Sequence, residues 1–98
     1  MLKKSYSATR QKCLVTFELQ PNSEVDTAHV CGEFNAWSTT RHPMKRRKDG
    51  AFWLSLWVTA GHEYRFRYLL DGERWQNDQT ADGYVPNPYG GEDGVLTV

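Results

Sequence analysis

The 98-residue chain has the length of one domain, and 39% of its residues are hydrophobic, so we expect residues 1–98 to form a single module with one core. Its formal net charge of zero argues against a nucleic-acid partner, because proteins bind that polyanion mainly through an excess of Lys and Arg. No apolar run approaches the roughly 20 residues of a membrane-spanning helix, and no signal-peptide core follows the first residues, so we expect a cytoplasmic protein with no membrane partner.

The first predicted strand covers residues 13–19. Residues 1–9 precede it and are expected to be loose, as chain ends often are. Apolar residues alternate with others along this strand, which predicts that one of its faces is buried. That inward face carries Cys13, Val15, Phe17 and Leu19.

A second strand is predicted over residues 28–34, with Val30 and Phe34 on one face. Cys31 falls on the outward face of this strand, whereas Cys13 falls on the inward face of the first strand. A disulfide between the two is therefore not favoured, and a count of only two cysteines is typical of a domain that is not secreted. An irregular segment that contains Trp37 follows this strand.

A hairpin is predicted in the middle of the chain. Met44 begins a short edge strand, and the turn signal Asp49-Gly50 leads into a longer strand. Trp53 and Trp57 lie on one face of that longer strand, and we expect them to be partly exposed to solvent. The opposite, inward face carries Phe52, Leu54, Leu56 and Val58.

The next strand, residues 64–70, places Phe66 and Tyr68 inward and Arg67 outward. Residues 73–94 are polar and rich in Gly, Pro, Asn and Asp, which predicts an irregular segment before a last strand over residues 95–98. Short alternating strands with a turn about every ten residues favour an all-β fold, an immunoglobulin-like antiparallel β-sandwich of six to eight strands. A small barrel is the alternative architecture.

The sequence offers no constellation for catalysis. No nucleophile elbow is present, and His29, His42 and His62 are isolated from one another. The two Cys and three His residues lack the close spacing of a zinc site, and no glycine-rich loop leads into a helix. The acidic residues fall in turns of a domain too small for a glycosidase cleft. We therefore expect no catalytic residue, no metal and no cofactor.

A neutral sugar ligand fits the aromatic residues better. Sugar rings have flat C–H faces that stack on exposed indoles, and hydroxyls that need polar partners. Two of the four Trp residues, Trp37 and Trp75, lie outside the inward alternation. These two rings are candidates for a ligand platform, with loop anchoring as the alternative for each.

The order of several motifs resembles carbohydrate-binding module family 48, which includes the isoamylase-type early-set domains and the glycogen-binding domain of the AMP-activated kinase β subunit. The motifs are residues 30–38 (VCGEFNAWS), residues 64–72 (YRFRYLLDG), Trp75 and residues 86–93 (PNPYGGED). The resemblance runs from Cys13 to Val98. It implies an early-set sandwich that binds α-1,4-linked glucan on an outer face.

The resemblance also implies the sugar-contacting residues. Trp37 and Trp75 match the stacking tryptophans, Arg67 matches a lysine, and Tyr89 and Asp93 match a leucine and an asparagine near the last strand. Arg67 keeps the charge but changes the donor geometry, and Asp93 accepts hydrogen bonds but cannot donate them. One extra residue precedes Trp75 relative to the family pattern.

The same family suggests a second role. In branching and debranching enzymes the module is fused to a catalytic barrel and in some cases packs against it. No barrel follows Val98, so we expect a stand-alone module that either binds glucan or docks on a separate partner, such as a glycoside hydrolase, a transferase or a kinase. Trp53 and Trp57 form the predicted docking patch.

Overall fold

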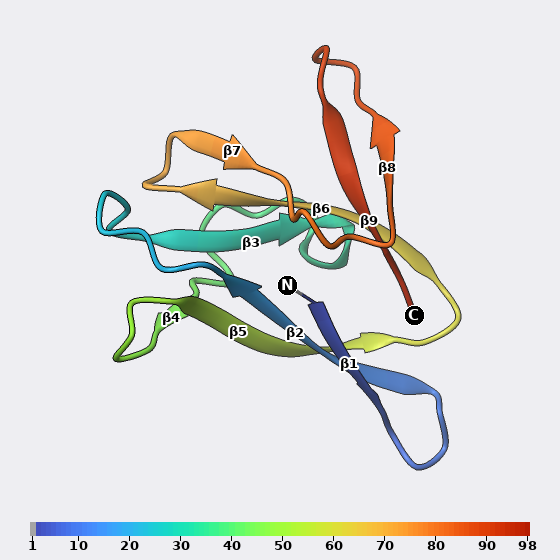
Figure 1. Cartoon of the computed structure of the whole chain (residues 1–98). Helices are drawn as coiled ribbons and strands as arrows, with labels where there is room; N and C mark the ends of the chain where they lie inside the picture. The colour runs from blue at the N-terminus through green and yellow to red at the C-terminus, as the bar shows by residue number, and fades with distance from the viewer. Residues whose placement is uncertain (1) are drawn as a thin grey trace.

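Two antiparallel sheets face each other in the structure, a computed structural model that describes residues 2–98 (Figure 1). The first sheet has the strand order β1-β2-β5-β4, and the second has the order β3-β6-β9-β8, with β7 paired to β6 outside that path. The first sheet consists of β1 (Leu2–Tyr6), β2 (Lys12–Leu19), β4 (Lys45–Arg46) and β5 (Phe52–Thr59). The second consists of β3 (Ala28–Gly32), β6 (Glu63–Leu70), β7 (Arg74–Gln76), β8 (Gly83–Pro86) and β9 (Glu92–Thr97). This arrangement confirms the predicted all-β sandwich.

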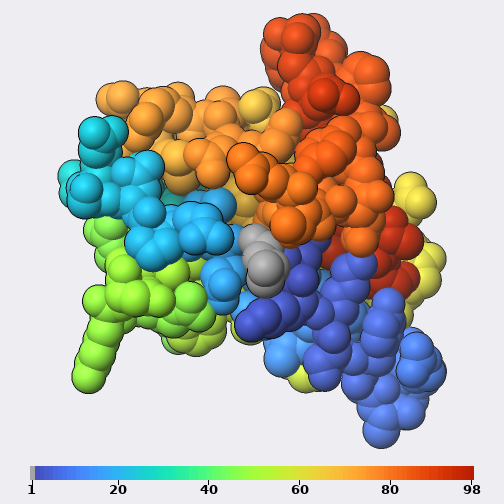
Figure 2. Space-filling model, in the orientation of Figure 1, coloured from blue at the N-terminus to red at the C-terminus, as the bar shows by residue number. Residues whose placement is uncertain are grey.

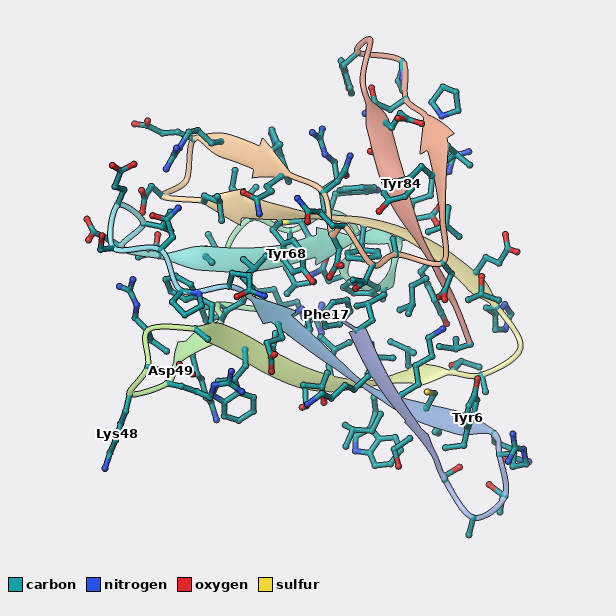
Figure 3. The ribbon with its side chains drawn as sticks, in the orientation of Figure 1. Tyr6, Phe17, Lys48, Asp49, Tyr68 and Tyr84 are labelled. Atoms are coloured by element: carbon teal, nitrogen blue, oxygen red, sulfur yellow. The ribbon has the colours of Figure 1, made fainter. Side chains whose placement is uncertain are left out.

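The core lies between the sheets and is built by the predicted alternation. Phe17 of β2 meets Phe66 and Tyr68 of β6, with ring centroids 5.3 and 6.3 Å apart (Figure 3). All three side chains are fully buried. Burial of one large apolar side chain is worth about 1.5–3 kcal/mol, so this aromatic cluster contributes strongly to holding the two sheets together.

Several predicted boundaries are wrong. Residues 2–6, which we expected to be loose, form β1 and pair along their whole length with β2. The strand predicted over residues 28–34 ends at Gly32, because a short 3₁₀ helix, η1 (Glu33–Asn35), takes over there. Phe34 still packs against the core from that helix.

The polar segment predicted to be irregular contains β7 and β8, and β9 begins at Glu92 rather than at residue 95. The described residues thus have nine strands, one more than the upper expectation. Strand β7 is exposed on both faces, and the β8–β9 hairpin projects from the body of the domain (Figure 2). Neither segment therefore shows a clear alternation of apolar and polar residues in its sequence. Backbone pairing with β6 and β9 therefore selects the strand conformation here.

The edge strand expected from Met44 is also shorter than predicted. Met44 itself is buried, and its N–H donates to the carbonyl of Ala28 in the second sheet, at 2.8 Å. Only the next two residues, which form β4, pair with β5 in the first sheet. Within residues 2–98 no helix is long and apolar enough to cross a membrane.

Candidate functional site

Strand β6 changes partner halfway along its length, and the candidate site lies at that change. Its residues 63–66 pair with β9, and its residues 68–70 pair with β7. Arg67 falls between the two stretches and sits opposite Cys31 of β3 on its other side. Because Phe66 and Tyr68 point into the core, the Arg67 side chain points to the outer face of the second sheet, as predicted.

Strand β7 brings Trp75 onto the same outer face. Trp75 is the register partner of Leu69, which is two residues beyond Arg67 and therefore on the same side of β6. The turn before β7 is fixed by Asp71, whose Oδ1 accepts hydrogen bonds from the N–H groups of Asp26 and Thr27, at 2.8 and 2.9 Å. The hydrogen bond from the Thr27 N–H has the largest effect on the pKa of Asp71, followed by the one from Asp26, and both hold this pKa below its ordinary value.

Trp37 reaches the site through a tight turn after η1. Ala36 and Trp37 both adopt left-handed backbone conformations, with φ values of 56° and 59°. Such conformations cost about 1 kcal/mol or more for a residue with a side chain. Two interactions offset this cost: Trp37 N donates to the carbonyl of Gly32 at 2.8 Å, and the buried Asn35 holds the turn from inside.

Asn35 is the anchor of that turn. Its Oδ1 accepts from the N–H of Gly32 at 3.1 Å, and its Nδ2 donates to the carbonyl of Val30 at 2.9 Å and to His42 Nδ1 at 2.9 Å. The last contact makes Nδ1 of His42 an acceptor. Burial, followed by the nearby charge of Arg41, lowers the pKa of His42, which favours this neutral form.

The turn also requires a glycine at its start. A Cβ atom on Gly32 would lie 2.6 Å from the carbonyl oxygen of Arg65 and 2.8 Å from Cβ of Phe66. The carboxylate of Glu33 accepts a hydrogen bond from the N–H of Arg65 at 2.7 Å, which ties η1 to β6. The FNAW segment is therefore pressed against the strand that carries Arg67.

The three residues predicted to share a site do come together. The rings of Trp37 and Trp75 have centroids 6.4 Å apart and meet at an interplanar angle of 74°. The guanidinium carbon of Arg67 lies 5.7 Å from the centroid of the Trp75 ring, a cation–π arrangement. Trp75 is 42% exposed and Trp37 is half-buried. We call Trp37, Trp75 and Arg67 the platform.

Two buried polar atoms in this region have no hydrogen-bond partner among the described residues: Arg67 Nε and Asn77 Oδ1. Asn77 follows β7, and its Nδ2 donates to the carbonyl of Glu92 in β9 at 2.9 Å. Asn77 was not among the site residues predicted from the sequence. The signal that would have found it is its spacing, because a residue two positions after Trp75 in an extended segment lies on the same face.

The other two predicted contacts belong to the β8–β9 hairpin. Tyr89 is 92% exposed at the hairpin tip, and Asp93 is only 7% exposed. Asn87 orders the tip, since its Oδ1 accepts from the N–H groups of Tyr89 and Gly91, and its Nδ2 donates to Asp93 Oδ1 at 3.2 Å. Among the described residues, no ring contact joins Tyr89 to the platform.

The burial of Cys31 was not expected from its outward position. It lies on the outward face of β3, opposite Arg67, yet it is fully buried. Its outward direction was predicted correctly, but that face of the sheet is covered at this point. Burial raises the pKa of the Cys31 thiol to about 11. Both Cys31 and Cys13 are free thiols.

Trp53 and Trp57 lie on the outer face of the other sheet, on β5. Trp57 is 57% exposed, and Trp53 is half-buried beneath the ammonium group of Lys45, 5.2 Å from the ring centroid. The predicted partial exposure of both rings is confirmed. They are on the side of the sandwich opposite to the platform. In the part of the chain described here, no three His, Cys, Asp or Glu residues are grouped as a metal site would need.

Comparison with known protein families gives one match. The model of the family described as carbohydrate-binding module 48 (isoamylase N-terminal domain) matches residues 8–90 of the chain. The match includes Trp37, Arg67, Trp75 and the tip residue Tyr89, and it ends before Asp93. No curated protein sequence matches the chain significantly.

Proposed function

Because the chain belongs to the carbohydrate-binding module 48 family, we propose that it binds α-1,4-linked glucan, such as glycogen or starch, on the platform and catalyses no reaction itself. Carbohydrate binding is the general property of the family. The choice of α-glucan and of these residues is our proposal. The observation that carries it is the assembly of two tryptophans and an arginine on one outer face.

The angle between the two rings supports a curved ligand. Flat crystalline polysaccharides need indole rings that lie in one plane, so that consecutive sugars stack on consecutive rings. The rings of Trp37 and Trp75 meet at 74° and therefore form a corner. An α-1,4-glucan chain bends at each linkage, so it can present the C–H face of one sugar to Trp75 and an edge of the next sugar to Trp37.

Polar groups around the corner suit the hydroxyls of such a chain. Arg67 Nε is a donor and Asn77 Oδ1 is an acceptor, and both lack a protein partner. Both atoms are shielded from solvent in the free protein, so a ligand hydroxyl would bond to either one only after the side chain rotates toward the ligand. Tyr89, at the exposed hairpin tip, and Asp93 below it would contact sugars further along the chain.

A binding assay with three polysaccharides tests the proposal. The purified chain should be retained by glycogen and by insoluble starch but not by microcrystalline cellulose, and maltoheptaose should quench its tryptophan fluorescence. Incubation with glycogen should release no reducing sugar above the level of a heat-denatured control. Equal retention by cellulose and starch would contradict the argument from the ring angle, and release of sugar would contradict the non-catalytic role.

Protein docking is the second candidate function. The observation that favours it is the 57% exposure of Trp57 on a sheet face that has no part in the platform. Large exposed aromatic rings are enriched in protein interfaces. The two functions are separable, because glucan binding depends on Trp37 and Trp75 and docking depends on Trp57. A partner such as a glycoside hydrolase, a transferase or a kinase would then hold the module by the first sheet while glucan occupies the second.

A further inference from the structure

Strand β5 has an open edge along most of its length. On one side, β2 pairs with all eight of its residues, 52–59. On the other side, β4 pairs only with Phe52 and Trp53. No other described segment forms backbone hydrogen bonds with residues 54–58 on this side. Because hydrogen bonding alternates along a strand, about half of the N–H and C=O groups in this stretch point to the open edge.

The edge is open because the chain changes sheets. The carbonyl of His42 accepts a hydrogen bond from Val30 N at 3.1 Å, and Pro43 forms a bridge with His29, so this segment lines β3 in the second sheet. It crosses to β5 only at Lys45. In Figure 1, β4 accordingly lies at one end of β5, and the rest of β5 continues past it.

A groove of about 330 Å³ follows this open edge. Apolar and polar side chains line it together: Leu56 and Val58 of β5, Phe34 of η1 and Tyr64 of β6 supply its apolar part, and Trp57 forms part of its wall. Side chains from both faces of β5 therefore border it, as they must when a groove runs along a strand edge. Its volume lies at the lower end of the range for ligand sites and fits one or two apolar side chains.

The charge of the groove identifies the kind of occupant. Its charged residues are Lys12 and Arg41, and no Asp or Glu lines it. Neither cation has a carboxylate partner within residues 2–98. A second copy of this chain, paired edge to edge, would bring the same cations to the interface and would be repelled. An acidic segment is attracted instead.

We propose that β5 accepts an extended acidic segment of a partner protein as an additional strand beside residues 54–58; the next carbonyl, of Thr59, already accepts a hydrogen bond from the Tyr64 hydroxyl at 3.1 Å. The segment's backbone pairs with the open edge of β5, its apolar side chains enter the groove, and its carboxylates approach Lys12 and Arg41. Five paired residues span about 17 Å at roughly 3.4 Å per residue. Main-chain pairing supplies affinity, while the groove and the two cations supply specificity. The site is distinct from the platform, because none of the platform residues lines the groove.

Defined peptides test this site with the full ¹⁵N-labelled chain. The probe is an acetylated and amidated eight-residue peptide that alternates Asp with Val, and the control peptide carries Lys in place of Asp. The acidic peptide should shift the amide resonances of residues 54–58 and increase their protection against hydrogen exchange. The lysine peptide should bind at least tenfold more weakly. Equal binding of both peptides, or shifts confined to the platform, would overturn the proposal.

Two further measurements separate strand pairing from simple ion attraction. N-methylation of the peptide at either the Asp or the Val positions removes alternate N–H groups, so one of these two peptides should lose binding and the other should retain it. Equal binding by both N-methylated peptides contradicts strand pairing. Identical shifts on addition of inorganic phosphate alone would identify an anion site and contradict it too.

Variants of the chain complete the test. Lys12→Glu combined with Arg41→Glu should weaken binding of the acidic peptide about tenfold, because both charges that face its carboxylates are reversed. Addition of 0.5 M salt should weaken binding to the parent. Trp37→Ala should bind the peptide as the parent does, which keeps this result separate from glucan binding. Self-association at the β5 edge, seen as concentration-dependent sedimentation without peptide, would favour a second copy and overturn the assignment.

Discussion

Replacing Trp75 by alanine is the sharpest test of the platform. Trp75 remains 42% exposed in the free protein, and a Trp side chain offers up to about 250 Å². Roughly 100 Å² is thus available to a ligand, which corresponds to about 2.5 kcal/mol at ~25 cal/mol per Å². One sugar covers a single face of the ring, so about half of this energy is realised. Trp75→Ala should weaken maltoheptaose binding about tenfold, with roughly sixtyfold as the upper limit.

The same change also affects stability, because more than half of the ring is covered in the folded protein. Trp75 packs against Trp37 and beneath the guanidinium of Arg67. Loss of these contacts should cost about 2 kcal/mol of unfolding free energy. For a domain of this size that is a fall in Tm of roughly 10 °C. Titrations at 10 °C, with the fold checked by circular dichroism, therefore separate lost binding from lost structure.

Trp57→Ala is the matched control, because it removes the same kind of side chain, with similar exposure, from the opposite sheet. It should leave maltoheptaose affinity unchanged. Trp75→Phe should keep part of the affinity, since a ring remains. If Trp75→Ala binds like the parent while folded, or if Trp57→Ala is the weaker binder, the platform is not the sugar site and the argument from exposed area fails.

Three other predictions concern the frame that positions the platform. Gly32→Ala places a Cβ 2.6 Å from a backbone oxygen and should lower stability by about 2–3 kcal/mol, whereas Gly83→Ala, with 3.9 Å of clearance, should change it little in the same melts. Tyr68→Phe removes a 2.6 Å hydrogen bond to Asp78 and should cost about 1–3 kcal/mol at pH 7. Burial alone would raise the pKa of Asp78, but hydrogen bonds from Thr80 and Tyr68 outweigh it and hold this pKa below 3.8. The stability cost of Tyr68→Phe should therefore shrink in acid titrations, as the pH falls through the lowered pKa of Asp78. Cys31, with its pKa raised to about 11 from 9.0, should stay unreactive to iodoacetamide at pH 8 in the folded chain, and stability should fall from pH 9 to pH 11 because the unfolded thiol ionises first.

Each of these three predictions can be contradicted by a specific result. Equal melting temperatures of the two glycine variants would show that the close approach at Gly32 is relieved at little cost. A pH-independent effect of Tyr68→Phe would separate the hydrogen bond from the charge of Asp78. Rapid alkylation of Cys31 in the native protein would mean that the outer face of β3 is open above it.

The faces of the long strands could be predicted from the sequence because period-two alternation is a local signal. It assigned Phe17, Phe66 and Tyr68 to the core and Arg67 to the outer face, all correctly. It also kept Trp37 and Trp75 out of the core. The alternation cannot measure the distance between two loops, so the 6.4 Å contact between those rings was expected from a family resemblance and not from the pattern itself.

The errors arose where local signals conflict with long-range pairing. Strands β1, β7 and β8 are mostly exposed, so their sequences lack the buried stripe that marks a strand. Their extended conformation depends on backbone bonds to β2, β6 and β9. The turn after Gly32 is a similar case, since residues 33–35 continue a plausible strand pattern but are drawn into a helical turn by Asn35.

Several locally unfavourable features of the molecule lie at the proposed platform, although Arg10 and Asp71 also have positive φ values and His29 Nδ1 is also unpaired. Two consecutive left-handed residues, Ala36 and Trp37, and an unpaired buried donor on Arg67 are each unfavourable for folding alone. They occur within one small region, and the same region holds partly exposed aromatic rings. The turn that holds Trp37 against Trp75 fits the proposed binding surface, because rings that are already in place lose little entropy when a ligand arrives.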